Sequence, residues 1–243
     1  MSTVQSNEIL RVMPREMRMM SERILSMTGQ PKGLFLAIQD VPMYSQKLGL
    51  GGFALLEKRF DELCEARPET IAIVSEEGSS LRLDGKGQHA WFVVPAIIDL
   101  LGELVARFGE AEVTVADVID PEEFKLVKAF AQRNGLSVAA SLGSDTIFTA
   151  SPRTLAGDVR QNDPLLWSLL EHGLPIQPDL WWRIYHLAKK ALATDSVVSR
   201  RHAGPMIVNQ DGTVIGRKDN DDETDVSFLM APRAETQTES TNS

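Results

Sequence analysis

The chain of 243 residues is 43% hydrophobic and 24% charged, as in ordinary globular proteins, which excludes collagen-like, low-complexity and wholly disordered classes. Its formal net charge is -9 and it has no long Lys/Arg cluster, so neither nucleic acid nor an anionic membrane is an expected partner. The single cysteine, Cys64, excludes an intrachain disulfide and a cysteine-based zinc site. The sequence contains neither a signal-peptide pattern nor an uninterrupted membrane-length apolar run, so a cytoplasmic location is expected.

The first part of the chain is predicted to be helical. Met, Leu and Ile recur at spacings of three and four over residues 10–27, which places them on one face of a helix. Residues 33–48 are weakly helical, and 53–63 form an amphipathic helix. The glycine cluster at 49–52 fits the end of a helix better than a phosphate-binding loop, because the segment before it is not a predicted strand.

The pattern changes to short strands near residue 70. Residues 71–77 and 80–84 are predicted to form a hairpin, and the apolar run from His89 to Phe108 a long helix. Between 113 and 150 the pattern is strand, helix, strand and strand, so at least one crossover helix is expected in the sheet.

After Pro152 the chain becomes helical again, at 165–173 and 179–193. Two short strands, 205–208 and 213–216, are predicted around a turn at Asp211-Gly212. The whole pattern predicts an α/β fold with a mixed sheet, crossover helices and an N-terminal helical region.

The chain is predicted to form a single globular domain over 1–232, with a division into 1–67 (helical) and 68–232 (mixed α/β) as the alternative. Residues 233–243 are polar and apolar-poor, so they are predicted to be a disordered tail. From residue 218 onward the chain has seven acids against two bases, a net charge of -5, so this end of the chain is acidic.

The segment 84–91, Asp-Gly-Lys-Gly-Gln-His-Ala-Trp, is the first candidate binding site. It follows a predicted strand and opens a long helix, so backbone N–H groups there could attract an anion. Lys86 could add a positive charge and His89 a proton relay. The alternative is a glycine-rich turn with an exposed lysine and a half-buried histidine.

The segment 195–205 is the second candidate. Ser199, Arg200, Arg201 and His202 lie together just after a predicted helix. Arginine can hold a carboxylate or phosphate with two parallel hydrogen bonds. The alternative is a solvated basic turn that pairs with the acidic stretch downstream.

Motifs of the common hydrolases and metal sites are absent from the sequence. There is no HExxH and no GxSxG, and the acidic stretch 217–225 does not have the spacing of a calcium loop. No metal site is therefore predicted, and the sequence indicates no particular cofactor or catalytic residue.

Short motifs near the two ends of the chain resemble a bacterial family of unknown function. They are Asn-Glu-Ile at 7–9, the segment Ser-Arg-Arg-His-Ala-Gly-Pro-Met at 199–206, and Asp-Asn-Asp at 219–221. The chain has His202 to Pro205 where that family has a plainer Gly/Ala run. Members of the family are often encoded beside oxidoreductases of the malate/L-lactate dehydrogenase type, but the resemblance implies no activity.

Two hypotheses about function stay open. In the first, the protein binds a small anionic metabolite, a carboxylate or phosphate, through Ser199, Arg200, Arg201 and His202, with Lys86 and His89 as a second contact, and could be an enzyme of central or amino-acid metabolism. In the second, it is a non-catalytic accessory subunit that docks on a partner, or on a second copy, through the Met-rich helix at 10–27.

Overall fold

The computed structural model describes residues 9–192, 207–208 and 214–215. The chain divides into two units, Met1–Leu192 and Ala193–Ser243, and each is described by itself. The predicted domain of 1–232 and the predicted tail of 233–243 stay predictions. In the second unit, β8 (Ile207–Val208) pairs antiparallel with β9 (Val214–Ile215), at the place of the two predicted short strands.

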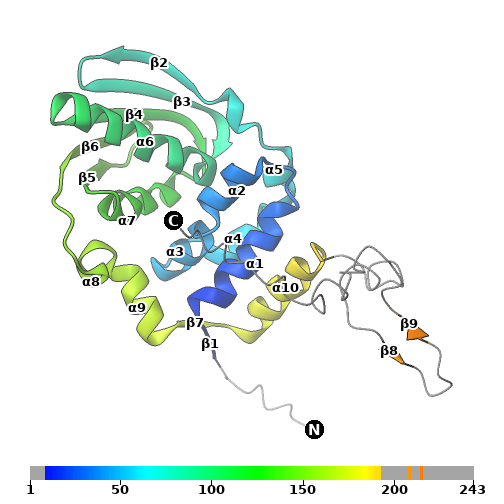
Figure 1. Cartoon of the computed structure of the whole chain (residues 1–243). Coiled ribbons are helices and arrows are strands. Elements are labelled where there is room, and N and C mark those ends of the chain that lie inside the picture. The colour runs from blue at the N-terminus through cyan, green and yellow to red at the C-terminus, as the bar shows by residue number, and fades with distance from the viewer. Residues whose placement is uncertain (1–8, 193–206, 209–213, 216–243) are drawn as a thin grey trace, which may run out of the picture. The chain divides into compact units, whose positions relative to one another are not determined.

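The N-terminal region of the first unit is helical, as predicted (Figure 1). Its elements are β1 (Leu10–Val12), α1 (Pro14–Ser26), α2 (Lys32–Ile38), α3 (Val41–Lys47), α4 (Gly52–Lys58) and α5 (Phe60–Glu65). The apolar run 10–27 is not helical over its whole length, because residues 10–12 pair antiparallel with β7 (Leu174–Ile176). Pro14 starts the helix, at a position where its missing N–H costs no hydrogen bond.

The Met-rich face of α1 packs inside its own chain. Met17 and Ile24 are completely buried and Met20 is 3% exposed, whereas Met13 is 38% exposed. An apolar face that is already covered by its own core has little surface left for a partner. The hypothesis of docking through this helix therefore loses its main support.

A five-stranded mixed sheet forms the centre of the unit and confirms the predicted α/β class. Its order is β2-β3-β4-β6-β5, with β3 parallel to β4 and the other pairs antiparallel. The elements in chain order are β2 (Ala72–Glu77), β3 (Ser80–His89), α6 (Ala90–Phe108), β4 (Ala111–Ile119), a short 3-10 helix η2 (Pro121–Phe124), α7 (Lys125–Arg133), β5 (Leu136–Ser141) and β6 (Thr146–Pro152). Two helices are crossovers: α6 joins β3 to the parallel strand β4, and α7 joins β4 to β5, which run parallel because both are antiparallel to β6. Helix α6 ends at Gly109 in the left-handed conformation that glycine favours.

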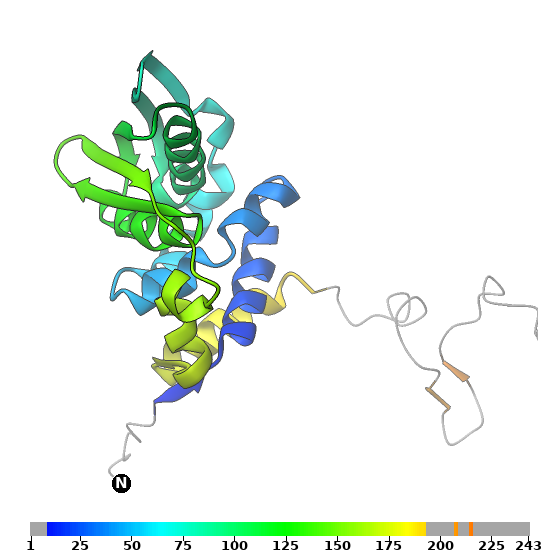
Figure 2. The same ribbon diagram turned by 60° about the vertical axis from the view of Figure 1, so that its left-hand side comes forward.

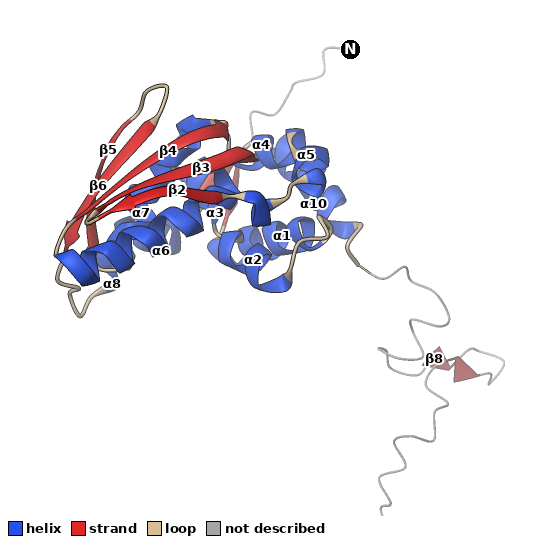
Figure 3. Ribbon diagram, turned by 90° about the horizontal axis from the view of Figure 1, so that it is seen from above, coloured by secondary structure: helices blue, strands red, loops and turns tan. Residues whose placement is uncertain are grey.

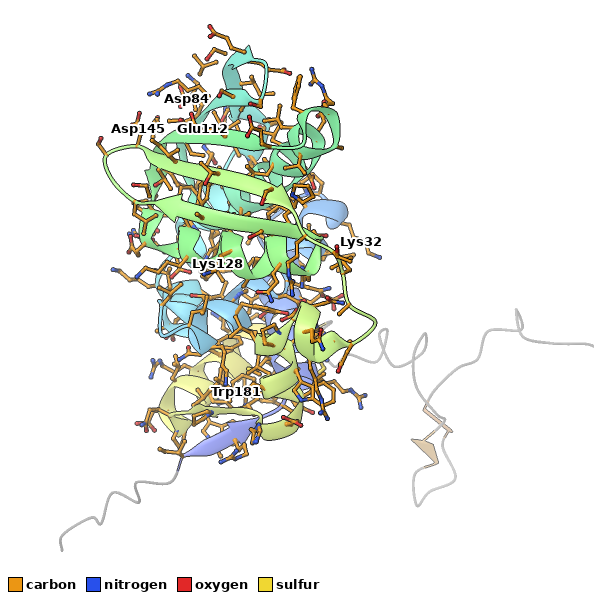
Figure 4. All side chains as sticks on the ribbon, turned by 90° about the vertical axis from the view of Figure 1, so that its left-hand side faces the viewer. Lys32, Asp84, Glu112, Lys128, Asp145 and Trp181 are labelled. Atoms are coloured by element: carbon orange, nitrogen blue, oxygen red, sulfur yellow. The ribbon has the colours of Figure 1, made fainter. Side chains whose placement is uncertain are left out.

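Helices α6 and α7 lie on the same face of this sheet (Figure 3). Buried and exposed side chains alternate along the strands accordingly. On β4, Ala111 and Val113 are buried, whereas Glu112 between them is exposed. The hydrophobic core thus forms between the sheet and one layer of helices. Polar side chains such as Glu112 and Asp145 remain at the surface (Figure 4).

The last part of the first unit returns to the N-terminal helices. It consists of α8 (Val159–Asn162), α9 (Pro164–His172), β7 and α10 (Pro178–Lys189). Helix α10 packs against α1 and α4, so the two ends of the unit lie side by side (Figure 2). None of the helices described is long and apolar enough to cross a membrane.

The core position of α1 can be tested with two neighbouring methionines. We expect Met17→Ala to lower the free energy of unfolding by about 2–5 kcal/mol, because it leaves a cavity at a fully buried site. Met19→Ala, at a position that is 38% exposed, should change it by less than about 0.5 kcal/mol. Urea denaturation would measure both, and equal effects would contradict the packing of α1 described here.

Candidate functional site

The first predicted site, residues 84–91, is mostly strand and not a loop. β3 continues to His89, and its pairing with β4 is irregular between Asp84 and Gln88. Lys86 sits in this irregular part with a φ of 53°, and its exposed ammonium pairs with Asp84 at 2.6 Å. Lys86 contacts Asp84, whereas His89 contacts other groups, and their predicted joint role in binding stays a prediction.

His89 is buried at the start of α6, and both of its ring nitrogens are engaged. Nδ1 accepts a hydrogen bond from the backbone N–H of Trp91 at 3.2 Å, and Nε2 lies 3.1 Å from Asp120 Oδ2. These partners assign the proton to Nε2, which then donates to the carboxylate. Burial lowers the pKa of His89, against the opposing effect of Asp120. The geometry gives His89 a role as a helix cap, and its predicted binding role stays a prediction.

Asp120, the partner of His89, is also held by Arg59. Arg59 Nε and Nη2 reach the two carboxylate oxygens at 2.9 and 3.0 Å. Burial raises the pKa of Asp120, but the hydrogen bonds and charges of Arg59 and His89 outweigh it and leave that pKa below its ordinary value. Asp120 therefore joins the end of α4 to the start of α6 as an ionised carboxylate.

The adjacent carboxylate of Glu123 is completely buried and makes two further links. Its Oε2 accepts from the indole N–H of Trp91 at 2.9 Å, and its Oε1 accepts from the backbone N–H of Gly51 at 2.8 Å. The glycine cluster thus serves the connection from α3 to α4, where a side chain at Gly52 would collide with Gln46. This agrees with a structural role for the glycines and not with a phosphate-binding loop.

The second predicted site lies outside the described residues. Ser199, Arg200, Arg201 and His202 all fall in the range 193–206. Their predicted role in anion binding stays a prediction.

A small cavity between helices α2, α3, α6 and α7 has the character of a ligand site. Its volume is about 130 Å³. Apolar residues form most of its wall: Ala37, Val41, Val94, Pro95, Ile98 and Phe130. Its polar groups are Arg133, Asn134 and, at the exposed rim, Asp99. An apolar wall with few polar groups is typical of small-molecule sites.

Arg133 is the cation of this cavity, and most of its hydrogen-bonding capacity is unused by the described residues. Its guanidinium lies over the ring of Phe130 at 4.4 Å, and Nη1 makes a long contact of 3.5 Å with Asp40 Oδ2. Asp40 is already bound at both oxygens by Arg18, at 2.6 and 3.0 Å. Since a guanidinium has five N–H donors in a planar fork, Arg133 can still donate two parallel hydrogen bonds to a carboxylate.

The wall behind Arg133 is rigid. The ring of Tyr44 is completely buried and stacks on Phe130 with a centroid separation of 4.8 Å. Its hydroxyl group donates a hydrogen bond to Asp163. Burial, reinforced by Asp163, raises the pKa of Tyr44, so its hydroxyl remains protonated. Asp163 in turn caps α9 through the backbone N–H of Leu166. A fixed aromatic wall of this kind holds the guanidinium in place before a ligand arrives.

The size of the cavity limits what it can hold. Its volume is about 130 Å³. Drug-sized ligands occupy pockets of about 300–1,000 Å³. The cavity is therefore suited to a molecule of a few carbon atoms and is too small for a nucleotide.

Arg133 was not predicted as a site residue because its local sequence pattern is ordinary. A basic residue in the last turn of a helix, here just before Asn134 and Gly135, is explained by the helix dipole alone. The apolar wall comes from four separate helices, so no local spacing marks it. The only signal was the well-defined end of α7.

Comparisons with known proteins give structural similarity only. No protein-family model and no curated protein matches the chain. Part of the fold is similar to malate dehydrogenase from Entamoeba histolytica (10% identity, TM-score 0.44, covering 79% of this chain and 72% of that one). It is also similar to malate dehydrogenase from Pyrococcus horikoshii (15%, 0.43, 79% and 68%) and sulfolactate dehydrogenase from Methanocaldococcus jannaschii (15%, 0.40, 73% and 68%). Similarities this distant say nothing about a ligand or a reaction.

The neutral, buried state of His89 has a measurable consequence. The pKa of folded His89 lies below its ordinary value of 6.5, so below that pH the unfolded chain binds more protons than the folded one. The contribution of His89 to the free energy of unfolding is therefore fully present above about pH 6.5 and is lost as the pH falls below it. His89→Asn keeps a side chain that can cap α6 but removes the titration. Between about pH 7 and pH 5, we expect the wild type to lose more stability than the variant, by at most about 1.4 kcal/mol per pH unit. Parallel curves from urea denaturation would show that His89 is not buried in its neutral form.

Proposed function

We propose that the protein binds a small carboxylate in the cavity at Arg133. The observation that supports this most directly is a guanidinium with spare donors, fixed over an aromatic ring at one side of a small apolar cavity. The carboxylate would take two hydrogen bonds from Arg133, and its short carbon chain would lie against Val94 and Ile98. This agrees with the expectation of a small anionic metabolite but moves the proposed site to different residues.

The cavity favours a carboxylate over a phosphate because of its charge. Arg133 is its one cation among the described residues, and Asp40 and Asp99 carry negative charge nearby. A singly charged carboxylate matches one guanidinium, whereas a doubly charged phosphate would lack a second cation. The apolar wall adds roughly 0.8 kcal/mol for each buried CH₂ group of a ligand.

The segment Ser199–His202 is a second proposed anion site, based on its sequence. Two adjacent arginines carry that proposal, and Lys86 with His89 stays its proposed second contact. We propose binding alone for either site.

A thermal-shift series tests the cavity. We expect propionate and butyrate to stabilise the wild type, by roughly 2.7 kcal/mol at 100 times the dissociation constant, and nucleotides to have no effect at this site. Arg133→Gln should abolish the shift while leaving the melting temperature without ligand nearly unchanged, because its contact with Asp40 is long.

Matched variants locate the site. Arg183→Gln alters a different cavity, of about 330 Å³ between α4, α5 and α10, and should leave carboxylate binding intact. Arg200→Ala and Arg201→Ala test the sequence-based site in the same way. A shift that survives Arg133→Gln but disappears with either of these variants would refute the Arg133 proposal.

Filling the cavity gives an independent test that keeps the guanidinium. Ala37→Leu adds three carbon atoms at the wall and should weaken butyrate binding by about tenfold, equivalent to about 1.4 kcal/mol. Its unfolding free energy without ligand should change by less than about 0.5 kcal/mol, because Ala37 is exposed. Calorimetric titration measures the affinity, and unchanged binding would show that the ligand lies elsewhere.

A further inference from the structure

The two edges of the five-stranded sheet differ in their protection. The edge strand β2 contains Glu76 and Glu77, and its pairing with β3 shifts between Ile73 and Ser75. Charged residues and irregular pairing are common ways to prevent an edge from pairing with another chain. The edge strand β5 has the sequence Leu-Ser-Val-Ala-Ala-Ser, which contains no charge and no proline, and its pairing with β6 is regular.

The free backbone groups of β5 can be assigned from its register. The N–H of Arg153 donates to the carbonyl of Gly135 at 2.8 Å, and the pairing then continues without interruption to Ser141. Because hydrogen-bonded and non-hydrogen-bonded pairs alternate in an antiparallel ladder, Leu136, Val138 and Ala140 direct their N–H and C=O groups away from β6. Among the described residues, β5 has no second neighbour in the sheet, so this row is unpaired (Figure 3).

A cationic hollow lies beside the same strand. It has a volume of about 210 Å³ and is lined by Lys128 and Gln132 of α7, by Leu136, Ser137 and Val138 of β5, and by Arg153. Arg153 donates to the carbonyls of Gln132 and Gln161, and Lys128 is exposed. No carboxylate lines the hollow, so the two positive charges are not neutralised there.

We propose that β5 and this hollow form a docking site for an extended acidic segment of a partner protein, which adds a sixth strand to the sheet. The partner's backbone would pair with Leu136, Val138 and Ala140. Alternate side chains of the added strand point to the helix side, where acidic residues would meet Lys128 and Arg153. A second copy of β5 fits less well, because its uncharged sequence offers nothing to these two cations.

The test uses the full chain and a fluorescein-labelled short peptide of alternating Glu and Val. We expect saturable binding by fluorescence anisotropy, and slowed amide exchange in β5 when the peptide is present. Lys128→Glu should weaken binding by about tenfold or more. Lys32→Glu, the same charge change at an exposed residue of α2 that does not line the hollow, should not (Figure 4).

Two further arms separate strand pairing from simple charge attraction. Ala140→Pro removes one free N–H at an exposed position, and proline is tolerated on edge strands, so the variant should fold and bind weakly. A peptide N-methylated along one edge keeps its charge but cannot donate, so it should bind the wild-type chain about tenfold more weakly.

Several outcomes would overturn the proposal: no saturable binding, equal binding of a Lys/Val peptide, or equal binding of the N-methylated peptide. Dimerisation of the wild type that Ala140→Pro abolishes, seen by light scattering, would assign the edge to a second copy instead. None of these outcomes bears on carboxylate binding at Arg133.

Discussion

The buried carboxylate of Glu123 and its neighbour Asp120 connect the helical region to the sheet. Glu123 is inaccessible to solvent and accepts hydrogen bonds from Trp91 at the start of α6 and from Gly51 before α4. Hydrogen bonds to charged groups contribute about 1.5–3 kcal/mol each, and leaving a buried charge without its partner costs about 3–5 kcal/mol. The relative position of α4, α6 and η2 therefore depends on these few polar contacts as much as on apolar packing.

The same connection positions the helices that line the cavity at Arg133 and the hollow beside β5. With α6 and α7 held on one face of the sheet, the N-terminal helices α2 and α3 close against them and leave the small cavity at Arg133. Helix α7 takes part on two sides: Arg133 lies at the cavity, whereas Lys128 and Gln132 lie beside the edge strand β5. One helix thus lines both the proposed ligand site and the proposed docking site, whose chemistry differs.

The polar side chains of the first unit fall into two groups: those that are paired with another side chain in good geometry, and those that keep unused hydrogen-bond donors. Arg18 with Asp40, Arg59 with Asp120 and Tyr44 with Asp163 are paired in good geometry. His89 belongs to this class, since both its nitrogens are bound and its pKa is lowered by burial. Arg133 differs, because its carboxylate neighbour Asp40 already accepts hydrogen bonds from Arg18. Arg133 keeps donors that no described residue uses, at the wall of an apolar cavity, and is therefore the better candidate for binding.

The local pattern of the sequence determined most of the secondary structure. Proline and glycine mark the ends of α1, α6 and α7, and the apolar periodicity marks their buried faces, because both effects act within a few residues along the chain. One exception is Leu10–Val12, whose apolar spacing continues that of α1 but which pairs with β7, a partner more than 160 residues away. Another is the segment up to His89, which continues strand β3 beyond its predicted end.

Only the tertiary structure decided the functional reading of these residues. The sequence could not show that Asp120 and the backbone N–H of Trp91 contact the two ring nitrogens of His89. Arg133 had no distinguishing pattern, since its cavity is assembled from four helices and its carboxylate neighbour is claimed by Arg18 from α1. Hydrogen-bond satisfaction depends on groups brought together from distant parts of the chain, and periodicity along the sequence carries no information about them.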